Sequence, residues 1–422
     1  METRIQDLDF RSIIRPGDTV VWSQGTSEPV SLIERLVEQR KELGGIRVFL
    51  GSSYCEAIQP DHADWIRFIG IGAVGRTKKF YDAGALEIIP CHLTDIPRLM
   101  QDGRLQIDVV LLQASENSAG ELSYGLVSSY LTTAVEGARA VVAEINDHTP
   151  WTCSTTPLKR DQVHYTVRTS RPLQELPVRP PTPSDVRIAE RVAGLIEDGD
   201  ILQIGIGTLP DAILTSLSDR KNLGIHSGII SDGVADLIQS GVVTNATKTV
   251  DRGITVTGGL FGSRKLYELA HCNPSIRVDP VVYTHSTSIL GSFDAFVTIN
   301  AAIEVDLTGQ VNGEVANGAY LGIVGGQTDF SRAAAQCSRG RSIVVVPSRT
   351  GRGVNRIVDR LSQGVVSAAR ADADIIVSEY GIAHLRGCSI SERARRMIAI
   401  AHPDDRAALE AAARNIPGAV GL

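Results

Sequence analysis

Short apolar runs alternate with longer segments of helical periodicity along almost the whole chain. The runs are bounded by glycine, proline or charged residues and predict β-strands. In several segments between them, apolar residues recur at spacings of three and four, which predicts amphipathic helices. Strands that alternate with helices are typical of βαβ units, so the pattern predicts mostly parallel sheets. The expected strands are 19–22, 46–50, 68–71, 107–113, 140–144, 201–206, 225–231, 295–299, 342–347 and 375–379, and the clearest expected helices are 29–39, 186–196, 210–217 and 233–239.

The segment 171–184 departs from this alternation because prolines are concentrated in it. Proline lacks the N–H that a central strand must donate, so this segment does not belong to the interior of a sheet. A proline-rich sequence is instead typical of a stiff, extended connection between domains. We therefore expect an α/β protein with two similar, open, mostly parallel-sheet domains, comprising residues 1–180 and 181–422.

The overall charge argues against two classes of partner. The 422 residues include 42 Lys and Arg against 48 Asp and Glu, a formal net charge of −6. Nucleic acids and anionic membranes select a basic surface, so neither is expected as a main partner. An anionic small molecule fits this composition if cations and backbone amides gather locally. The 40 glycines suit the many tight turns of an α/β fold.

The cysteine spacing and the N-terminal sequence bear on metal content and location. The six cysteines are scattered without a CxxC pair, which argues against a zinc site. Reduced, mostly buried thiols are typical of a cytoplasmic protein. The first residues show no basic segment followed by an apolar one, and no apolar stretch reaches the roughly 18 residues that a membrane span needs. We expect a cytoplasmic protein without a bound metal.

The sequence Ile204-Gly-Ile-Gly-Thr-Leu-Pro210 joins an expected strand to an expected helix. Glycines allow a ligand to approach the backbone, and a helix N-terminus offers N–H groups to an anion. The turn is therefore either a cradle for a phosphate or an oxyanion, or only a tight turn. A dinucleotide fingerprint fits poorly, because Pro210 stands at the third glycine position and no acidic residue follows at the usual offset.

The next expected strand, 225–231, contains the sequence His226-Ser-Gly228. If this strand neighbours the preceding one, its carboxyl end lies beside the glycine turn, at the edge where open α/β sheets bind ligands. Side chains two residues apart on a strand point to the same side. We therefore expect His226 to point in the direction in which a side chain at position 228 would point.

Longer motifs occur in both halves of the chain. They are Ser27-Glu-Pro29, Ile88-Ile-Pro-Cys-His-Leu-Thr-Asp-Ile-Pro97, Val141-Val-Ala-Glu-Ile-Asn146, Gly205-Ile-Gly-Thr-Leu-Pro210, Ile225-His-Ser227, Ser231-Asp-Gly233, Ile299-Asn-Ala-Ala-Ile-Glu-Val-Asp-Leu-Thr-Gly-Gln-Val-Asn312, Gly325-Gly-Gln-Thr-Asp-Phe330, Ser378-Glu-Tyr-Gly-Ile-Ala-His-Leu-Arg-Gly387 and Ile400-Ala-His-Pro-Asp-Asp-Arg406. Through these motifs the chain resembles, over nearly its whole length, the acetyl-CoA hydrolase/transferase family of class I CoA-transferases, which includes 4-hydroxybutyrate CoA-transferase.

The resemblance implies two similar α/β domains of CoA-transferase type, with the acyl-CoA site between them and mostly on the second. It implies that the partners are an acyl-CoA and an acceptor. Coenzyme A is then part of the substrate rather than a permanently bound cofactor. The resemblance does not decide whether the protein is a homo-oligomer. In such enzymes a glutamate attacks the thioester, a mixed anhydride and then a glutamyl-CoA thioester form, and the acceptor carboxylate takes the CoA. The implied CoA-binding residues are Gly205, Ile206, Gly207, Thr208 and Leu209 in the first glycine turn and Gly325, Gly326 and Gln327 in a second glycine loop.

The chain departs from the family pattern at three positions. The family has His-Ser-Glu where this chain has His226-Ser-Gly228, so glycine occupies the position of the nucleophilic carboxylate. His285 stands where asparagine is usual, and Leu321 where serine is common. Three changes around one expected pocket favour a natural, divergent member over a single laboratory substitution. No glutamyl-CoA intermediate forms at a glycine, and we expect Gly228→Glu to restore it.

Other residues are candidates for catalysis or binding. Glu379 matches a family glutamate near the acyl site and is either a site residue or a structural acid. His226 and His285 are either core histidines or general bases that activate water, an alcohol or an amine. Glu304 is expected to be a structural carboxylate rather than a substitute nucleophile. Arg386 either orients Glu379, meets a CoA phosphate or forms a surface ion pair.

Two basic runs, 349–356 and 393–396, are expected to be solvated faces, although one of them could receive the nucleotide phosphates. Three hypotheses on function remain. In the first, the protein acts on an acyl-CoA by direct attack on the thioester, with hydrolysis or acyl transfer to a non-carboxylate acceptor. In the second, it is a CoA-transferase with a relocated nucleophile or a ternary-complex mechanism. In the third, it is a catalytically silent CoA-binding subunit.

Overall fold

The computed structural model describes residues 1–176 and 179–421, so part of the proline-rich connection, residues 177–178, lies outside the described residues. The chain divides into two compact units. Unit 1 comprises Met1–Pro177, Ile254–Thr284 and Tyr320–Ile323, and unit 2 comprises Val178–Gly253, His285–Ala319 and Val324–Leu422. The expected domain boundary at residue 180 stays a prediction, because two segments of the second half of the chain pack with unit 1.

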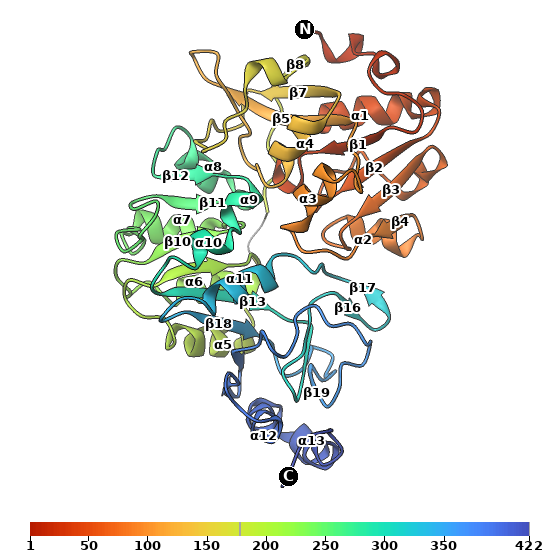
Figure 1. Ribbon diagram of the computed structural model, residues 1–422. Coiled ribbons are helices and arrows are strands. Elements are labelled where there is room, and N and C mark those ends of the chain that lie inside the picture. Colours follow the sequence, from red (N-terminus) through yellow and green to blue (C-terminus); the bar gives the residue numbers. More distant parts are fainter. Residues whose placement is uncertain (177–178, 422) are drawn as a thin grey trace. The chain divides into compact units, whose positions relative to one another are not determined.

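Unit 1 is built on a mostly parallel sheet with the strand order β4-β3-β2-β1-β5-β7-β8, to which β6 adds an antiparallel pair with β5 (Figure 1). The strand order reverses between β1 and β5, which are parallel neighbours. The strands are β1 (Thr19–Trp22), β2 (Ile46–Leu50), β3 (Ile66–Gly70), β4 (Leu86–Ile88), β5 (Val109–Glu116), β6 (Leu122–Ser123), β7 (Ala140–Asn146) and β8 (Tyr165–Thr169), and the helices are α1 (Val30–Gln39), α2 (Thr77–Asp82), α3 (Asp95–Gln101) and α4 (Leu131–Gly137).

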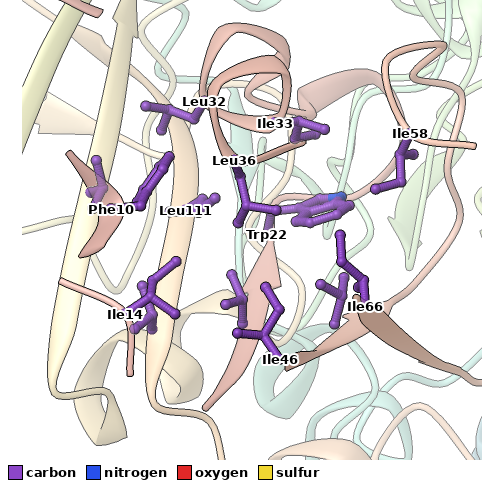
Figure 2. Packing of buried hydrophobic residues seen from close by; sticks show 14 of the residues in the cluster. Phe10, Ile14, Trp22, Leu32, Ile33, Leu36, Ile46, Ile58, Ile66 and Leu111 are labelled. Carbon is purple, nitrogen blue, oxygen red and sulfur yellow. The ribbon is translucent and has the colours of Figure 1, made fainter. Parts of the chain in front are cut away.

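Both faces of this sheet are covered, which explains why its central strands β1, β5 and β7 are nearly continuous buried runs rather than alternating ones. Val20 and Trp22 of β1 belong to one apolar cluster, whereas Val21 between them belongs to another. Figure 2 shows Trp22 near Leu36 of α1 and near Ile66 of β3, a strand of the same sheet.

The segment 254–284 adds a second parallel pair to unit 1, formed by β11 (Thr255–Thr257) and β12 (Ile276–Val278), with α8 (Arg264–Ala270) and α9 (Val281–Thr284). Hydrogen bonds connect it to the first half of the chain. The Thr26 hydroxyl donates to the carbonyl of Leu260 over 2.7 Å.

Unit 2 contains the consecutive strands β10-β9-β13-β18-β20-β21, which are parallel except for the antiparallel last pair. Here the strand order reverses between β9 and β13. These strands are β9 (Ile201–Ile204), β10 (Gly224–Ser227), β13 (Phe296–Ala301), β18 (Arg341–Val345), β20 (Ile375–Ser378) and β21 (Gly381–His384); the helices are α5 (Pro183–Ala193), α6 (Thr208–Thr215), α7 (Asp232–Gln239), α10 (Thr287–Leu290), α11 (Gln327–Ala334), α12 (Ile390–Ile400) and α13 (Arg406–Ala413).

A small sheet follows β13, with β14 (Glu304–Asp306) between β15 (Val311–Asn312) and β19 (Ile357–Val358). The remaining short elements are β16 (Val315–Ala316), β17 (Ala319–Tyr320) and the 3₁₀ helices η1 (Ile5–Asp7), η2 (Phe10–Ser12), η3 (Gly25–Ser27), η4 (Arg40–Leu43), η5 (Pro60–Asp64), η6 (Arg160–Gln162) and η7 (Pro403–Asp405).

The expected α/β fold with two mostly parallel sheets is confirmed, but two strands next to the candidate site end earlier than expected. The strand expected over 201–206 ends at Ile204, and the turn that follows contains Gly207 with φ +116°. The strand expected over 225–231 ends at Ser227, just before Gly228. Among the helices that the structure describes, none combines the length and the apolar character needed to cross a bilayer.

Unit 1 encloses a carboxylate without a cationic partner within ion-pair distance in the described residues. Glu28 is 4% exposed and accepts hydrogen bonds from the Ser53 hydroxyl, the backbone N–H groups of Tyr54 and Cys55, each over 2.7 Å, and the Trp22 indole over 3.3 Å. Burial outweighs these donors and raises the pKa of Glu28 from 4.5 to about 7. The folded state therefore holds a proton at Glu28 at pH values where the unfolded chain does not.

This raised pKa predicts a stability that falls with rising pH. The contribution is complete below pH 4.5, where both states are protonated, and is lost as the pH rises through about 7. Between pH 5 and 8 we expect the free energy of unfolding of unit 1 to fall by about 2–3 kcal/mol through this group. Glu28→Gln keeps an oxygen for the two backbone N–H groups and should flatten this slope.

Urea unfolding followed by tryptophan fluorescence measures the effect, because Trp22, Trp65 and Trp151 all lie in unit 1. Glu87→Gln is the matched control, since Glu87 lies exposed on β4, and it should keep the wild-type pH slope. A Glu28→Gln slope equal to that of the wild type contradicts the prediction.

Candidate active site

The first glycine turn faces open space. It follows β9 at the point where the strand order of unit 2 reverses, which is where ligands bind in open α/β sheets. Gly207 has φ +116°, a conformation that favours glycine. Apart from its chain neighbours, a Cβ atom added to Gly205 or Gly207 would meet no atom of the described residues within 4 Å. Ile206 lies between the two glycines, and Thr208 and Leu209 begin α6, so N–H groups of this turn border room for a ligand.

Gly228 directly follows the end of β10 and has no free space beside its Cα atom. A Cβ atom there would lie 2.8 Å from Cε1 and 3.1 Å from Nε2 of the His285 ring, and 3.6 Å from Cζ of Phe330. Real Cβ atoms essentially never approach another atom this closely. The position where the family has its nucleophile, by the resemblance, is thus filled by an imidazole from another part of the chain.

The same imidazole presses against the second glycine loop. A Cβ atom on Gly326 would lie 2.5 Å from Nε2 of His285. The ring of Phe330, one turn into α11, lies 4.3 Å from the His285 ring, centroid to centroid, and tilts 36° against it. The ring of His285 therefore lies between Gly228 and Gly326 and against Phe330. Both glycines are required sterically as long as this ring is present.

Burial determines the charge of His285. The residue is 4% exposed, and burial lowers the pKa of its imidazole from 6.5 to about 3. Burial disfavours the charged imidazolium, because the charge loses its hydration there. The ring is therefore neutral at physiological pH, and it can accept a proton or a hydrogen bond.

The second glycine loop leads into α11. Gly325 has φ +67°, and Gln327 is the first residue of the helix. The side-chain amide nitrogen of Gln327 is buried and has no hydrogen-bond acceptor within the described residues. A buried amide without an acceptor is costly. It is the kind of group that a ligand carbonyl or anion satisfies.

The other two predicted catalytic residues have their own surroundings. His226 is fully buried on β10, and its ring lies 5.4 Å from that of Phe293, centroid to centroid; its expected direction toward position 228 stays a prediction. Glu379 follows β20 and is 8% exposed. Its two carboxylate oxygens accept hydrogen bonds from the backbone N–H and the hydroxyl of Ser348, over 2.9 and 2.7 Å.

Three further candidates have defined partners. Arg386 pairs with Asp374 at 3.0 Å, which agrees with the surface ion pair among the expected alternatives. Glu304 begins β14 and accepts a hydrogen bond from the Ser362 hydroxyl over 2.9 Å. Leu321 belongs to unit 1 and is 47% exposed. In the described residues, no group of three or more His, Cys, Asp or Glu side chains could hold a metal ion.

Two residues of this region were missed by the sequence analysis. Phe330 lies one helical turn after Gly326, and this spacing of four could have indicated that its ring covers the glycine. Ser348 holds the Glu379 carboxylate, but nothing in its sequence context distinguishes it from other serines after a strand.

Comparison with known proteins places the chain among enzymes of coenzyme A. Two family models match, the acetyl-CoA hydrolase/transferase N-terminal domain over residues 5–165 and the C-terminal domain over residues 262–413. The 4-hydroxybutyrate coenzyme A transferase of Clostridium kluyveri is 38% identical over 401 residues, which cover 92% of each chain.

Solved structures agree with this assignment. RipA from Yersinia pestis matches with a TM-score of 0.92 and 31% identity over 98% of this chain and 97% of that one. The 4-hydroxybutyrate CoA-transferase of Porphyromonas gingivalis matches with a TM-score of 0.84 and 32% identity over 98% and 97%. The chain belongs to the acetyl-CoA hydrolase/transferase family.

Proposed function

We propose that this protein acts on an acyl-CoA by direct attack on the thioester, without a glutamyl-CoA intermediate. The observation that supports this most is the neutral ring of His285 in contact with Gly228, at the position where the family, by the resemblance, has its glutamate. A glycine offers no carboxylate, and the ring leaves no space for one. The same ring is a proton acceptor at the place where the nucleophile would otherwise stand.

The chemistry follows from these groups. A water molecule, or the hydroxyl or amine of an acceptor, attacks the thioester carbonyl while the imidazole of His285 takes its proton. Backbone N–H groups of the two glycine loops stabilise the oxyanion of the tetrahedral intermediate. The carbon–sulfur bond then breaks, and the imidazolium returns its proton to the departing CoA thiolate. A pKa of about 3 makes the imidazole a weak base and the imidazolium a strong acid, so burial favours the return of the proton over its uptake.

Glu379 is better suited to positioning than to attack. Ser348 donates hydrogen bonds to both oxygens of the Glu379 carboxylate. The backbone of Glu379 is also bound, because Nε and Nη2 of Arg191 donate to its carbonyl over 3.4 and 3.3 Å. A nucleophilic carboxylate must leave such partners before it reacts. This supports direct attack over a nucleophile relocated to Glu379.

Loss of the proposed base should abolish turnover. We expect His285→Gln to reduce the release of free thiol from butyryl-CoA by roughly 10²- to 10⁴-fold. His148→Gln is the control, because His148 is an exposed histidine of unit 1. Thiol release is followed with a disulfide reagent that reports free CoA, with water alone and with added acetate.

The pH dependence of the rate of thiol release is a second test of His285 as the base. Since burial holds the pKa of His285 at about 3, the base form persists throughout the range from pH 8 to 5, and the rate should not fall there through this residue. New acyl-CoA formed only with acetate would identify a CoA-transferase instead. Binding of butyryl-CoA without any turnover would identify a silent subunit, and either result contradicts the proposal.

The close contact at Gly228 makes a steric prediction. Gly228→Ala should reduce the free energy of unfolding by about 1–3 kcal/mol, because its Cβ overlaps the His285 ring. The second substitution His285→Ala should remove this penalty. Gly205→Ala is the matched control, because a Cβ atom there meets open space. Thermal unfolding of the wild type and these three variants measures the effect, and equal losses of stability for Gly205→Ala and Gly228→Ala contradict it.

The same contact changes the expectation for restoring the family nucleophile. Gly228→Glu alone should not give ping-pong transfer, because the His285 ring fills the required space. Gly228→Glu together with His285→Asn, the residue usual in the family by resemblance, should give CoA transfer from butyryl-CoA to acetate. Trapping the glutamyl thioester with borohydride detects the intermediate. Its formation in the single variant, or its absence in a double variant that still binds butyryl-CoA, contradicts this placement of the site.

A further inference from the structure

The loop after β18 contains the three arginines of the basic run 349–356, and the structure gives them different surroundings. Arg349 is paired with Asp405, with Nε and Oδ2 at 2.8 Å. Arg352 is exposed at the tip of the loop. Arg356 is partly buried at the returning end, where its backbone N–H donates to the carbonyl of Ser348 over 2.9 Å. Ser348 is the residue that binds the Glu379 carboxylate.

The guanidinium of Arg356 has no hydrogen-bond acceptor and no ion-pair partner within the described residues. Its Nε atom is buried. Three other arginines also have a buried Nε without an acceptor, but each engages its terminal nitrogens. Their partners are Glu56 for Arg76, the carbonyl of Ala193 for Arg220 and Asp200 for Arg341.

Partial burial of an arginine therefore does not explain why the guanidinium of Arg356 has no acceptor among the described residues. Burial also lowers the pKa of Arg393, yet its Nη1 donates to the carbonyls of Thr308 and Arg370 over 3.0 and 2.8 Å. A guanidinium has five N–H donors, and leaving them without acceptors in a partly buried place costs free energy. Arg356 differs from these arginines because no acceptor among the described residues binds any of its guanidinium donors.

Nearby carboxylates attract Arg356 but do not occupy its donors. The charges of Asp185, Glu304 and Glu379 act on Arg356 from beyond ion-pair distance, and the loss of hydration outweighs them, so the pKa of Arg356 is lowered. Each of these carboxylates has other donors, namely Thr182 for Asp185, Ser362 for Glu304 and Ser348 for Glu379. Their charges attract the Arg356 cation, while the N–H donors of its planar guanidinium can still bind a ligand.

We infer that Arg356 binds an anionic group of the substrate, either a phosphate of CoA or a carboxylate at the far end of the acyl group. Both present two oxygens that match the two parallel N–H donors of a guanidinium. This inference rests on the proposed function, because it takes the ligand to be an acyl-CoA. It identifies Arg356, rather than Arg349 or Arg352, as the member of the basic run that recognises the substrate.

Calorimetric binding tests the inference without depending on turnover. CoA, butyryl-CoA and succinyl-CoA are titrated into the full-length wild type, Arg356→Gln, Arg356→Lys and Arg352→Gln. If Arg356 binds a phosphate, Arg356→Gln lowers the affinity for all three ligands alike, by roughly 10- to 100-fold. If it binds an acyl carboxylate, only succinyl-CoA is weakened. Arg356→Lys keeps the positive charge but loses the two parallel N–H donors, so its affinity should lie between those of the wild type and Arg356→Gln. Arg352→Gln binds like the wild type.

Melting temperatures separate a ligand-binding arginine from a structural one. Without ligand, Arg356→Gln should melt at or above the wild-type temperature, because it removes an uncompensated charge, and CoA should stabilise it less than the wild type. Wild-type affinity of Arg356→Gln for all three ligands overturns the inference, whatever its melting temperature. A wild type that binds none of them overturns this inference and the proposed function together. Loss of turnover in His285→Gln with unchanged binding leaves the role of Arg356 intact.

Discussion

The candidate site depends on one constraint of volume: two glycines, far apart in the sequence, leave room for a single imidazole ring. Gly228 and Gly326 have no side chains, and His285 fills the space that side chains at either position would need. Phe330 closes one side of the ring. Because protein interiors are close-packed, the identity of each of these residues limits the others. The burial that results from this packing keeps the imidazole neutral, so geometry and protonation state have the same origin.

Each unit contains a buried titratable group, and the two respond to pH in opposite ways. Burial raises the pKa of Glu28 in unit 1, so that unit is more stable at low pH. Burial lowers the pKa of His285 in unit 2 from 6.5 to about 3, so the unfolded chain binds a proton first as the pH falls. Stability from this group is complete above pH 6.5 and is lost progressively down to about pH 3. Between about pH 4.5 and 6.5 the contributions of these two groups to stability therefore change in opposite directions.

Much of the fold was predictable from the sequence, because buried parallel strands leave a strong signal. Runs such as 19–22 and 140–144 are buried at every position and apolar at all but one, as expected for strands covered on both faces. The short strands β14, β15 and β19 were not predicted, since two or three residues are too few to establish a period. The end of β10 at Ser227 was also missed, because the apolar Ile229 and Ile230 continue the pattern beyond the strand.

The candidate site was predictable only in part. The glycine turns and the replacement at position 228 are local features, and the sequence identified them. The contact between His285 and Gly228 joins distant parts of the chain, and no spacing rule foresees it. In the run 349–356, composition alone does not distinguish Arg356 from Arg349, since only the folded chain shows which guanidinium has a carboxylate partner.

The filled space beside Gly228 also limits the order in which this sequence could have changed. A chain with any side chain at position 228 has no room for the ring of His285 in its present place. If the ancestor had the usual family residues, the loss of the carboxylate preceded the arrival of the histidine. Once the histidine was in place, a single reversion at 228 met a steric barrier. A return to a carboxylate at position 228 therefore requires a change at position 285 as well.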